Sequence, residues 1–294
     1  MSTHECILIG ADLSEMDQQL MRAARLLLPI WQTEKIYLLH VMPDFTVPKE
    51  AGTDFHKRFA PDQPVDEKVK NGLEKTAKDV FGTVVDNVSV DVREGKPYQK
   101  LLHWMEVKNA SMLIVGHKSS NHGSGITARR VARNVAADVL FVPETSRKGI
   151  ERIVVPIDFS ENSARAVMAA LHWKRHNPST GIDLVYFIDM PPSDYYIGAA
   201  RDTGLRAVLK DSARGAYQRF MAEFELDDRE VQMHFVDNAY SNVALHIDEF
   251  AKEKGADMIV IGAQGHSAFE RFLFGSVTEK LVEQNREQFM WVVR

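Results

Sequence analysis

Lys254-Gly-Ala-Asp-Met-Ile-Val-Ile-Gly262 has a near copy, Lys108-Asn-Ala-Ser-Met-Leu-Ile-Val-Gly116, that lies 146 positions earlier in the 294-residue chain. Both stretches end in consecutive apolar residues followed by a glycine. Consecutive apolar positions are typical of a strand that is buried on both faces of a parallel sheet. A repeated buried strand indicates that the chain contains one folding unit twice.

The repeat extends in both directions from this strand. At the same offset, Ile7-Leu-Ile-Gly-Ala-Asp12-Leu-Ser14 aligns with Ile153-Val-Val-Pro-Ile-Asp158-Phe-Ser160. After the two glycines the offset rises to 150, and Val139-Leu-Phe-Val142 aligns with Phe289-Met-Trp-Val292. The first copy is therefore four residues shorter between its last two apolar runs. We predict two domains of one kind, residues 1–146 and 147–294.

Each copy contains five apolar runs, and the segments between them have helical spacing. The runs are 6–11, 36–42, 86–93, 111–116 and 138–143 in the first copy, and 152–158, 182–188, 230–236, 257–262 and 288–293 in the second. Strands that alternate with helices predict a parallel sheet with right-handed crossovers. We therefore predict an α/β fold of two tandem, doubly wound, five-stranded parallel sheets in 3-2-1-4-5 order. Ser14 and Ser160 are placed as N-caps, and Pro156 either ends its strand or takes a position that donates no ladder bond.

The composition excludes several classes of protein. With 45% hydrophobic and 26% charged residues and a net charge of −5, the chain is typical of a soluble globular protein and not of one that binds nucleic acid or an anionic membrane through a dominant basic surface. The single cysteine, Cys6, excludes an internal disulfide and a cysteine-based zinc cluster. The spacing of the eleven histidines fits no metal cluster, so no protein-held metal is expected. No apolar run is long enough to span a bilayer and no signal peptide is apparent, so a cytosolic location is expected.

Glycines follow the fourth strand of the second copy. A loop with Gly262 and Gly265 leads to Gly275-Ser276 at the start of a helix. Glycines let the backbone approach phosphate oxygens, and a helix N-terminus adds N–H groups and a favourable dipole. This pattern predicts binding of a nucleotide triphosphate tail, although the same glycines could serve only as turns and a cap. Asp158, at the end of its strand, could bind ribose or adenine, ligate Mg²⁺, or cap the next helix.

These features together resemble the universal stress protein family. The residues that carry the resemblance are Pro156-Ile-Asp158-Phe-Ser160, Gly262-x2-Gly265-x9-Gly275-Ser276 and Val277-Thr-Glu-Lys280. The resemblance covers nearly the whole chain, as a tandem of two domains, and implies an adenine-nucleotide α-hydrolase-like fold that binds ATP with Mg²⁺. It implies that Asp158 lies against the adenosine and that the backbone of Phe187 bonds the adenine. It also implies that ribose and phosphates are held by Gly262, Gly265, Gly275, Ser276 and Val277.

Both copies depart from the family pattern. The second copy has Phe235-Val-Asp-Asn-Ala-Tyr-Ser241 where the first keeps Gly95-Lys-Pro97, which could reshape one wall of the pocket. In the first copy the loop is shorter, Ser119 replaces the second glycine, and Ile126 replaces the hydroxyl residue at the helix start. We expect that the first copy does not bind ATP in the family manner. The alternative is another anion nest, formed by Lys118, Ser119, Ser120, Gly123 and Ser124.

No motif indicates catalytic turnover. There is no Gly-x4-Gly-Lys-Ser/Thr loop and no Gly-x-Ser-x-Gly elbow. The acid and base candidates near the second loop, His266, Glu270 and Asp158, are not paired by sequence, so no catalytic residue is assigned. The preferred interpretation is a cytosolic, nucleotide-dependent regulator of the stress response. A nucleotide-free interaction scaffold and a slow ATP-hydrolysing enzyme are the alternatives.

The fifth strands predict how the copies associate. Residues 139–142 and 289–293 are apolar and are expected at a sheet edge, which has to be covered. The resemblance implies a dimer contact through this strand. We expect the two copies to form an internal pseudo-dimer, and a homodimer of the whole chain is the further option. Adenine nucleotide is the expected ligand, with neither membrane nor nucleic acid as partner.

Overall fold

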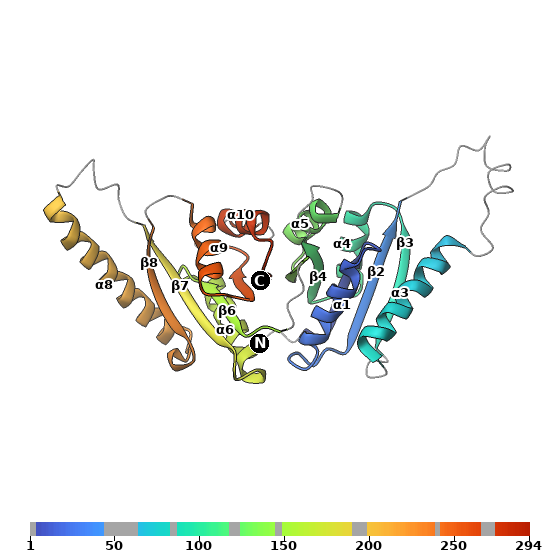
Figure 1. Ribbon diagram of the computed structural model, residues 1–294, viewed down its shortest axis with the longest axis horizontal. Coiled ribbons are helices and arrows are strands. Elements are labelled where there is room, and N and C mark those ends of the chain that lie inside the picture. The colour runs from blue at the N-terminus through green and yellow to red at the C-terminus, as the bar shows by residue number, and fades with distance from the viewer. Residues whose placement is uncertain are drawn as a thin grey trace. The chain divides into compact units, whose positions relative to one another are not determined.

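The computed structural model describes residues 4–43, 64–82, 87–117, 124–144, 149–189, 199–238, 242–265 and 274–294. The chain divides into two compact units, unit 1 (Met1–Glu144) and unit 2 (Thr145–Arg294), which are coloured from blue to green and from yellow to red in Figure 1. Each unit contains one copy of the repeat.

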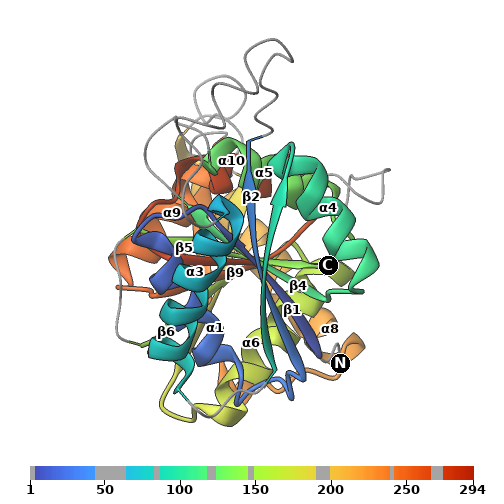
Figure 2. The same ribbon diagram turned by 90° about the vertical axis from the view of Figure 1, so that its right-hand side faces the viewer.

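Unit 1 is a parallel sheet with helices on both faces. Its elements are β1 (Cys6–Ala11), α1 (Met16–Leu27), β2 (Lys35–Met42), α3 (Val65–Phe81), β3 (Val88–Glu94), α4 (Pro97–Val107), β4 (Met112–His117), α5 (Ser124–Asn134) and β5 (Asp138–Pro143). The strand order is β3-β2-β1-β4-β5, and every pair is parallel. Helices α1 and α3 cover one face, and α4, with α5 packed against it, covers the other (Figure 2).

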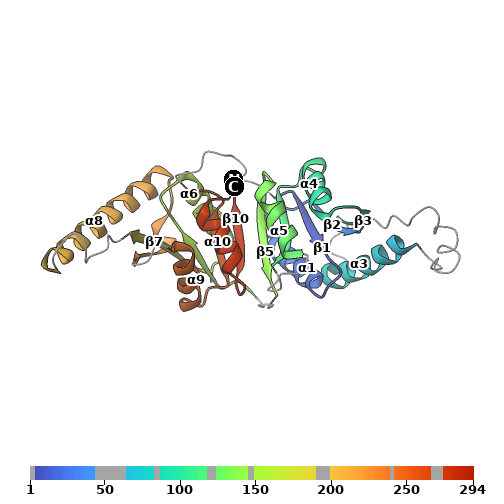
Figure 3. The ribbon, with the colours of Figure 1, turned by 90° about the horizontal axis from the view of Figure 1, so that it is seen from above.

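Unit 2 repeats this architecture. Its elements are β6 (Arg152–Pro156), α6 (Glu161–His176), β7 (Gly181–Asp189), α8 (Ala199–Glu223), a 3₁₀ turn (Asp228–Glu230), β8 (Gln232–Asn238), α9 (Val243–Glu253), β9 (Met258–Gly262), α10 (Ser276–Gln284) and β10 (Phe289–Val293). The strand order is β8-β7-β6-β9-β10, again parallel throughout. Figure 3 shows α6 and α8 on one face of this sheet and α9 and α10 on the other.

Consecutive buried residues in the central strands explain this layering. Ile7, Leu8 and Ile9 of β1 are fully buried, and so is the run 258–260 of β9. Because neighbouring residues of a strand point to opposite faces, these runs require a helical layer on each side. The predicted fold, two tandem five-stranded parallel sheets in 3-2-1-4-5 order, is confirmed.

Two local predictions had different outcomes. Ser160 is the N-cap of α6, and its hydroxyl oxygen accepts the N–H of Ser163 at 3.2 Å. The equivalent prediction for Ser14 is wrong, because Glu15 is the N-cap of α1 and the N–H of Asp17 donates to the Ser14 carbonyl instead. Pro156 is the last residue of β6, so its missing N–H falls where the strand ends.

Candidate functional site

A pocket of about 400 Å³ opens at the carboxyl ends of β6, β7 and β9 in unit 2. The strand order reverses between β6 and β9, and open α/β sheets bind their ligands at such a switch point. All of the residues predicted to form the nucleotide site line this pocket: Asp158, Phe187, Gly262, Gly265, Gly275, Ser276 and Val277. The structure therefore brings these residues together from separate segments, while their contact with a nucleotide stays a prediction.

Two of the glycines are required by close approach. A Cβ atom on Gly262 would lie 2.8 Å from the carbonyl oxygen of Asn162, which belongs to the first turn of α6. A Cβ atom on Gly265 would lie 2.5 Å from Oδ2 of Asp158. The loop backbone therefore reaches both α6 and the carboxylate only because neither position carries a side chain.

Ala263 connects the loop to its surroundings through both of its backbone groups. Its N–H donates to the carbonyl of Val293 in β10, and its carbonyl accepts the N–H of Gly275, each at 2.8 Å. Thr278 strengthens the arrangement, because its hydroxyl donates to the carbonyl of Gly262 at 2.9 Å. These bonds hold the end of β9 against the start of α10.

The first turn of α10 lies at the pocket. Gly275 is its N-cap, and Ser276, Val277 and Thr278 line the pocket wall. The first N–H groups of a helix have no partner within the helix and carry the positive end of its dipole. Ser276 is exposed, so its hydroxyl and the neighbouring N–H groups are accessible to an anion.

Asp158 is held in a fixed orientation. Its Oδ1 accepts the backbone N–H of Ser160 at 3.0 Å and the Ser160 hydroxyl at 2.5 Å. The intervening Phe159 has a φ of 64°, and Leu13 at the same position of unit 1 has a φ of 63°, so both copies make the same left-handed turn. The carboxylate therefore fixes the turn that leads into α6 and lines the pocket, while the N-cap of the helix is Ser160 and not Asp158.

The structure adds polar wall residues that the sequence did not single out. Tyr186, Asp189 and Gln264 also line the pocket. Burial, with the carboxylates of Asp189 and Asp158, raises the pKa of Tyr186, so its phenol stays protonated and can donate a hydrogen bond. Tyr186 could have been found from its place directly before Phe187 near the end of a strand. Successive side chains of a strand point to opposite sides, so where Phe187 offers its backbone the side chain of Tyr186 is the next candidate.

One wall of the unit 2 pocket is formed after β8, where the sequence departs from the family pattern. β8 continues to Asn238, whose side-chain amide donates to Oδ1 of Asp189 at 2.6 Å. Residues 239–241 lie outside the described part of the chain, as do His266 and Glu270. Val243 supplies the wall where unit 1 has Pro97. The amide of Asn238 thus holds Asp189 at the rim, a contact that the Gly-Lys-Pro form of the wall does not offer.

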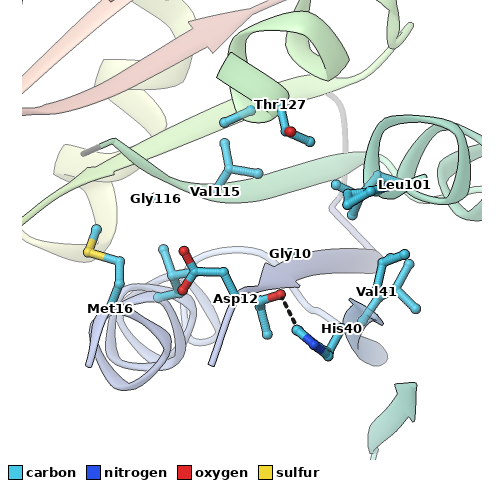
Figure 4. Close-up of a pocket in the computed structure, with 14 residues that line it drawn as sticks. Gly10, Asp12, Met16, His40, Val41, Leu101, Val115, Gly116 and Thr127 are labelled. Atoms are coloured by element: carbon cyan, nitrogen blue, oxygen red, sulfur yellow. Dashed lines mark hydrogen bonds between the residues drawn. The ribbon is translucent and has the colours of Figure 1, made fainter. Parts of the chain in front are cut away.

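Unit 1 has a smaller pocket of about 300 Å³ at the equivalent place. Figure 4 shows Gly10 and Asp12 on one side of it and Val115 and Thr127 on the other. Ile126, which replaces the hydroxyl residue, is 53% exposed. Residues 118–123 of the alternative anion nest lie outside the described part of the chain, and Ser124 begins α5.

A buried carboxylate lies behind this second pocket. Asp17 is 4% exposed and accepts the backbone N–H groups of Asp12 and Leu13, each at 2.9 Å. Burial is the main cause that raises the pKa of Asp17 from 3.8 to about 6, and the charge of Asp12 adds to it, while the two N–H bonds oppose it. The folded state therefore binds this proton more tightly than the unfolded state does.

We expect Asp17→Asn to change how the stability of unit 1 depends on pH. Ionising Asp17 in the fold carries a penalty that is absent below pH 3.8 and complete above about pH 6. Between pH 3 and 7.5 the free energy of unfolding of Asp17→Asn should therefore rise relative to the unsubstituted chain by about 3 kcal/mol. Urea unfolding at several pH values, read by hydrogen exchange of unit 1 peptides, measures this difference.

Asp79→Asn is the matched control, because it removes an exposed carboxylate from α3. A constant difference between Asp17→Asn and the unsubstituted chain across this pH range would contradict the prediction. Any hydrogen bond lost on substitution adds the same amount at each pH and does not affect the comparison.

The described residues contain neither a membrane-spanning helix nor a cluster of metal-ligating side chains. None of the described helices combines the length and hydropathy needed to cross a bilayer. In the same residues, no three His, Cys, Asp or Glu side chains gather as metal ligands.

The fold and the site define a tandem α/β protein with a glycine-lined pocket at the carboxyl edge of its second sheet. The chain belongs to the universal stress protein family, whose profile matches residues 4–143 and 149–286. Two matches in tandem cover both copies of the repeat, and the resemblance inferred from the sequence is confirmed.

The chain is also similar to individual universal stress proteins. The chain is 26% identical over 136 residues to the universal stress protein MJ0531 of Methanocaldococcus jannaschii. This alignment covers 45% of this chain and 76% of that protein. A universal stress protein from Archaeoglobus fulgidus has the same fold, with a TM-score of 0.62, 17% identity, and coverage of 100% of this chain and 99% of that chain. A universal stress protein solved in complex with cAMP matches 48% of this chain and 98% of its own, with 17% identity and a TM-score of 0.34.

Proposed function

We propose that unit 2 binds ATP and that the protein acts as a nucleotide-dependent regulator in the stress response. The observation that carries the proposal is the convergence of the glycine loop, the start of α10 and Asp158 on one pocket. Unit 1 retains Asp12 at the position of Asp158, but it lacks the second glycine and the hydroxyl residue of the loop. We therefore expect one nucleotide per chain.

The phosphate end of the nucleotide fits the loop and the start of α10. Gly265 and the first residues of α10, Ser276 and Val277, bring backbone N–H groups close to the pocket, and Gly265 has no side chain to exclude an oxygen. Ser276 adds a hydroxyl donor, and the helix dipole favours negative charge at this end. These groups supply donors to phosphate without a lysine, which is how this loop would differ from a P-loop.

The adenosine end fits the opposite side of the pocket. Phe187 lies near the end of β7 and is 8% exposed as a whole residue, and because its side chain has no hydrogen-bonding atom, only its backbone can bond an adenine edge. Asp158 accepts hydrogen bonds, as a ribose hydroxyl or an adenine amino group requires. The protonated phenol of Tyr186 adds a donor beside them.

Magnesium would arrive with the nucleotide. Mg²⁺ is commonly held by phosphate oxygens, water and one or two carboxylates rather than by a cage of protein ligands. Asp158 and Asp189 both line the pocket and are the carboxylates that could complete such a site. When bound, the ion would neutralise phosphate charge.

Titration of the full chain with MgATP by calorimetry tests the proposal. We expect one site per chain, and we expect the purified protein to carry adenine nucleotide detectable by mass spectrometry. Two equivalent sites would contradict the assignment to unit 2. If the protein neither carries nor binds adenine nucleotide, the scaffold interpretation replaces it, whereas multiple turnovers at about 1 s⁻¹ or faster would indicate an enzyme.

A further inference from the structure

We propose that the pocket of unit 1 is a separate binding site for a compact, largely apolar amine. The cavity of about 300 Å³ is bounded by β1, β2 and β4 of the sheet and by α1, α4 and α5. The proposal does not depend on nucleotide binding by unit 2.

Apolar side chains form most of the cavity wall. Leu20, Leu39 and Leu101 are buried, with exposed fractions of 1%, 1% and 6%. Met16 and Val115 close the cavity toward Gly116, and Figure 4 shows Met16 and Val115 on either side of this glycine. A wall of this kind stabilises an apolar body by removing its surface from water.

The polar groups of the cavity are chiefly hydrogen-bond acceptors. The Nδ1–H of His40 donates to the carbonyl of Ala11 at 3.0 Å, because a carbonyl can only accept. In the neutral ring Nε2 is then an acceptor, and the His40 side chain lines the cavity together with the carboxylate of Asp12. Thr127 is the one hydroxyl among the described lining residues. Acceptors of this kind require a ligand that brings donors.

Comparison with unit 2 shows how donors have been removed. Four positions that carry hydroxyl groups at the unit 2 pocket, Ser163, Tyr186, Ser276 and Thr278, correspond by the repeat to Asp17, His40, Ile126 and Ala128. Each substitution replaces a donor by an acceptor, an acidic group or an apolar side chain. The pocket of unit 1 therefore offers fewer side-chain donors than the pocket of unit 2, although Thr127 adds one hydroxyl where unit 2 has Val277.

Among ligands that carry hydrogen-bond donors, the charge of the unit 1 cavity wall favours a cationic one. The fourteen described lining residues include Asp12 but no lysine or arginine. The carboxylate of Asp17 lies directly behind Asp12 and adds negative potential. An ammonium group pairs with the carboxylate of Asp12, whereas an anionic ligand that brings no metal ion, such as a simple carboxylate, would face this charge without compensation.

Three probes that share a benzyl group and differ in their polar end test the proposal on the full chain: 2-phenylethylamine, 2-phenylethanol and phenylacetate. With [methyl-¹³C]methionine labelling, the Met16 signal, assigned by Met16→Leu, reports occupancy of the cavity by NMR. We expect 2-phenylethylamine to bind with a dissociation constant of about 1 mM, as suits a ligand of this size. Phenylacetate should bind at least about tenfold more weakly, with 2-phenylethanol between them.

Two variants locate the interaction. Asp12→Asn should weaken binding of the amine by about tenfold while changing that of the alcohol much less, since only the charge is lost. Asp158→Asn, the matched change in unit 2, should leave the Met16 titration unaltered. Thr127→Phe, at a half-buried position of α5, should block all three probes.

Several results would overturn the proposal. These are phenylacetate binding as tightly as the amine, an unchanged amine affinity in Asp12→Asn, and no shift of the Met16 signal with any probe up to about 20 mM. The comparison of the three probes uses the unsubstituted chain, so it remains decisive if a variant fails to fold.

Discussion

Gly265→Val is expected to lower the affinity of the chain for ATP by at least about a hundredfold. A Cβ atom at this position would lie 2.5 Å from Oδ2 of Asp158, and the branched side chain of valine extends further into the pocket. Asp158 cannot simply turn away, because its Oδ1 holds the N–H and the hydroxyl of Ser160. The substitution therefore displaces the carboxylate, the loop or both, and it fills space that phosphate would occupy.

Calorimetric titration with MgATP measures this loss. Gly204→Val is the matched control, because Gly204 lies on α8 where an added Cβ atom meets nothing within 4 Å. The control should bind ATP as the unsubstituted chain does. An unchanged affinity in Gly265→Val would show that the glycine loop does not hold the nucleotide, even if the chain binds ATP elsewhere.

Gly262→Ala is expected to destabilise unit 2 by about 2–3 kcal/mol. The added Cβ atom would lie within 2.9 Å of both the carbonyl carbon and the carbonyl oxygen of Asn162. These are backbone atoms of α6, so the helix or β9 must move to relieve the contact. Urea unfolding read by hydrogen exchange of β9 peptides measures the change in the free energy of unfolding.

The repeat supplies a control at the equivalent position. In Gly116→Ala the new Cβ atom would meet Cγ of Met16 at 2.9 Å, and this contact is with a flexible side chain. We expect a loss of about 1 kcal/mol or less in unit 1. Equal losses at the two glycines would contradict the view that the backbone of Asn162 makes the second position more demanding.

The sequence was sufficient for the fold because one unit occurs in it twice. An apolar run interrupted by a proline is ambiguous by itself, yet the run 152–158, which contains Pro156, aligns with the run 6–11, which contains no proline. The alignment indicated a strand in both places and located the loop that differs. The glycines of the unit 2 pocket were predictable because their spacing is specific and their position follows a buried strand.

Side-chain environment was not predictable in the same way. Ser14 and Ser160 occupy equivalent positions, but only Ser160 is an N-cap, because the N–H of Asp17 donates to the carbonyl of Ser14 in unit 1. The acceptor character of the unit 1 cavity depends on His40 Nδ1 bonding the Ala11 carbonyl, a contact between adjacent strands. Spacing along the chain carries no information about which ring nitrogen is used.

The two hydrogen bonds of Ala263 have a thermodynamic consequence. Its N–H is bonded to Val293 of β10 and its carbonyl to Gly275, so the start of α10 and the last strand are joined through one residue. Any energetic coupling between β10 and the loop that leads to α10 is therefore reciprocal. If pairing along β10 alters the affinity of the loop for its ligand by some factor, the ligand must alter the pairing of β10 by the same factor.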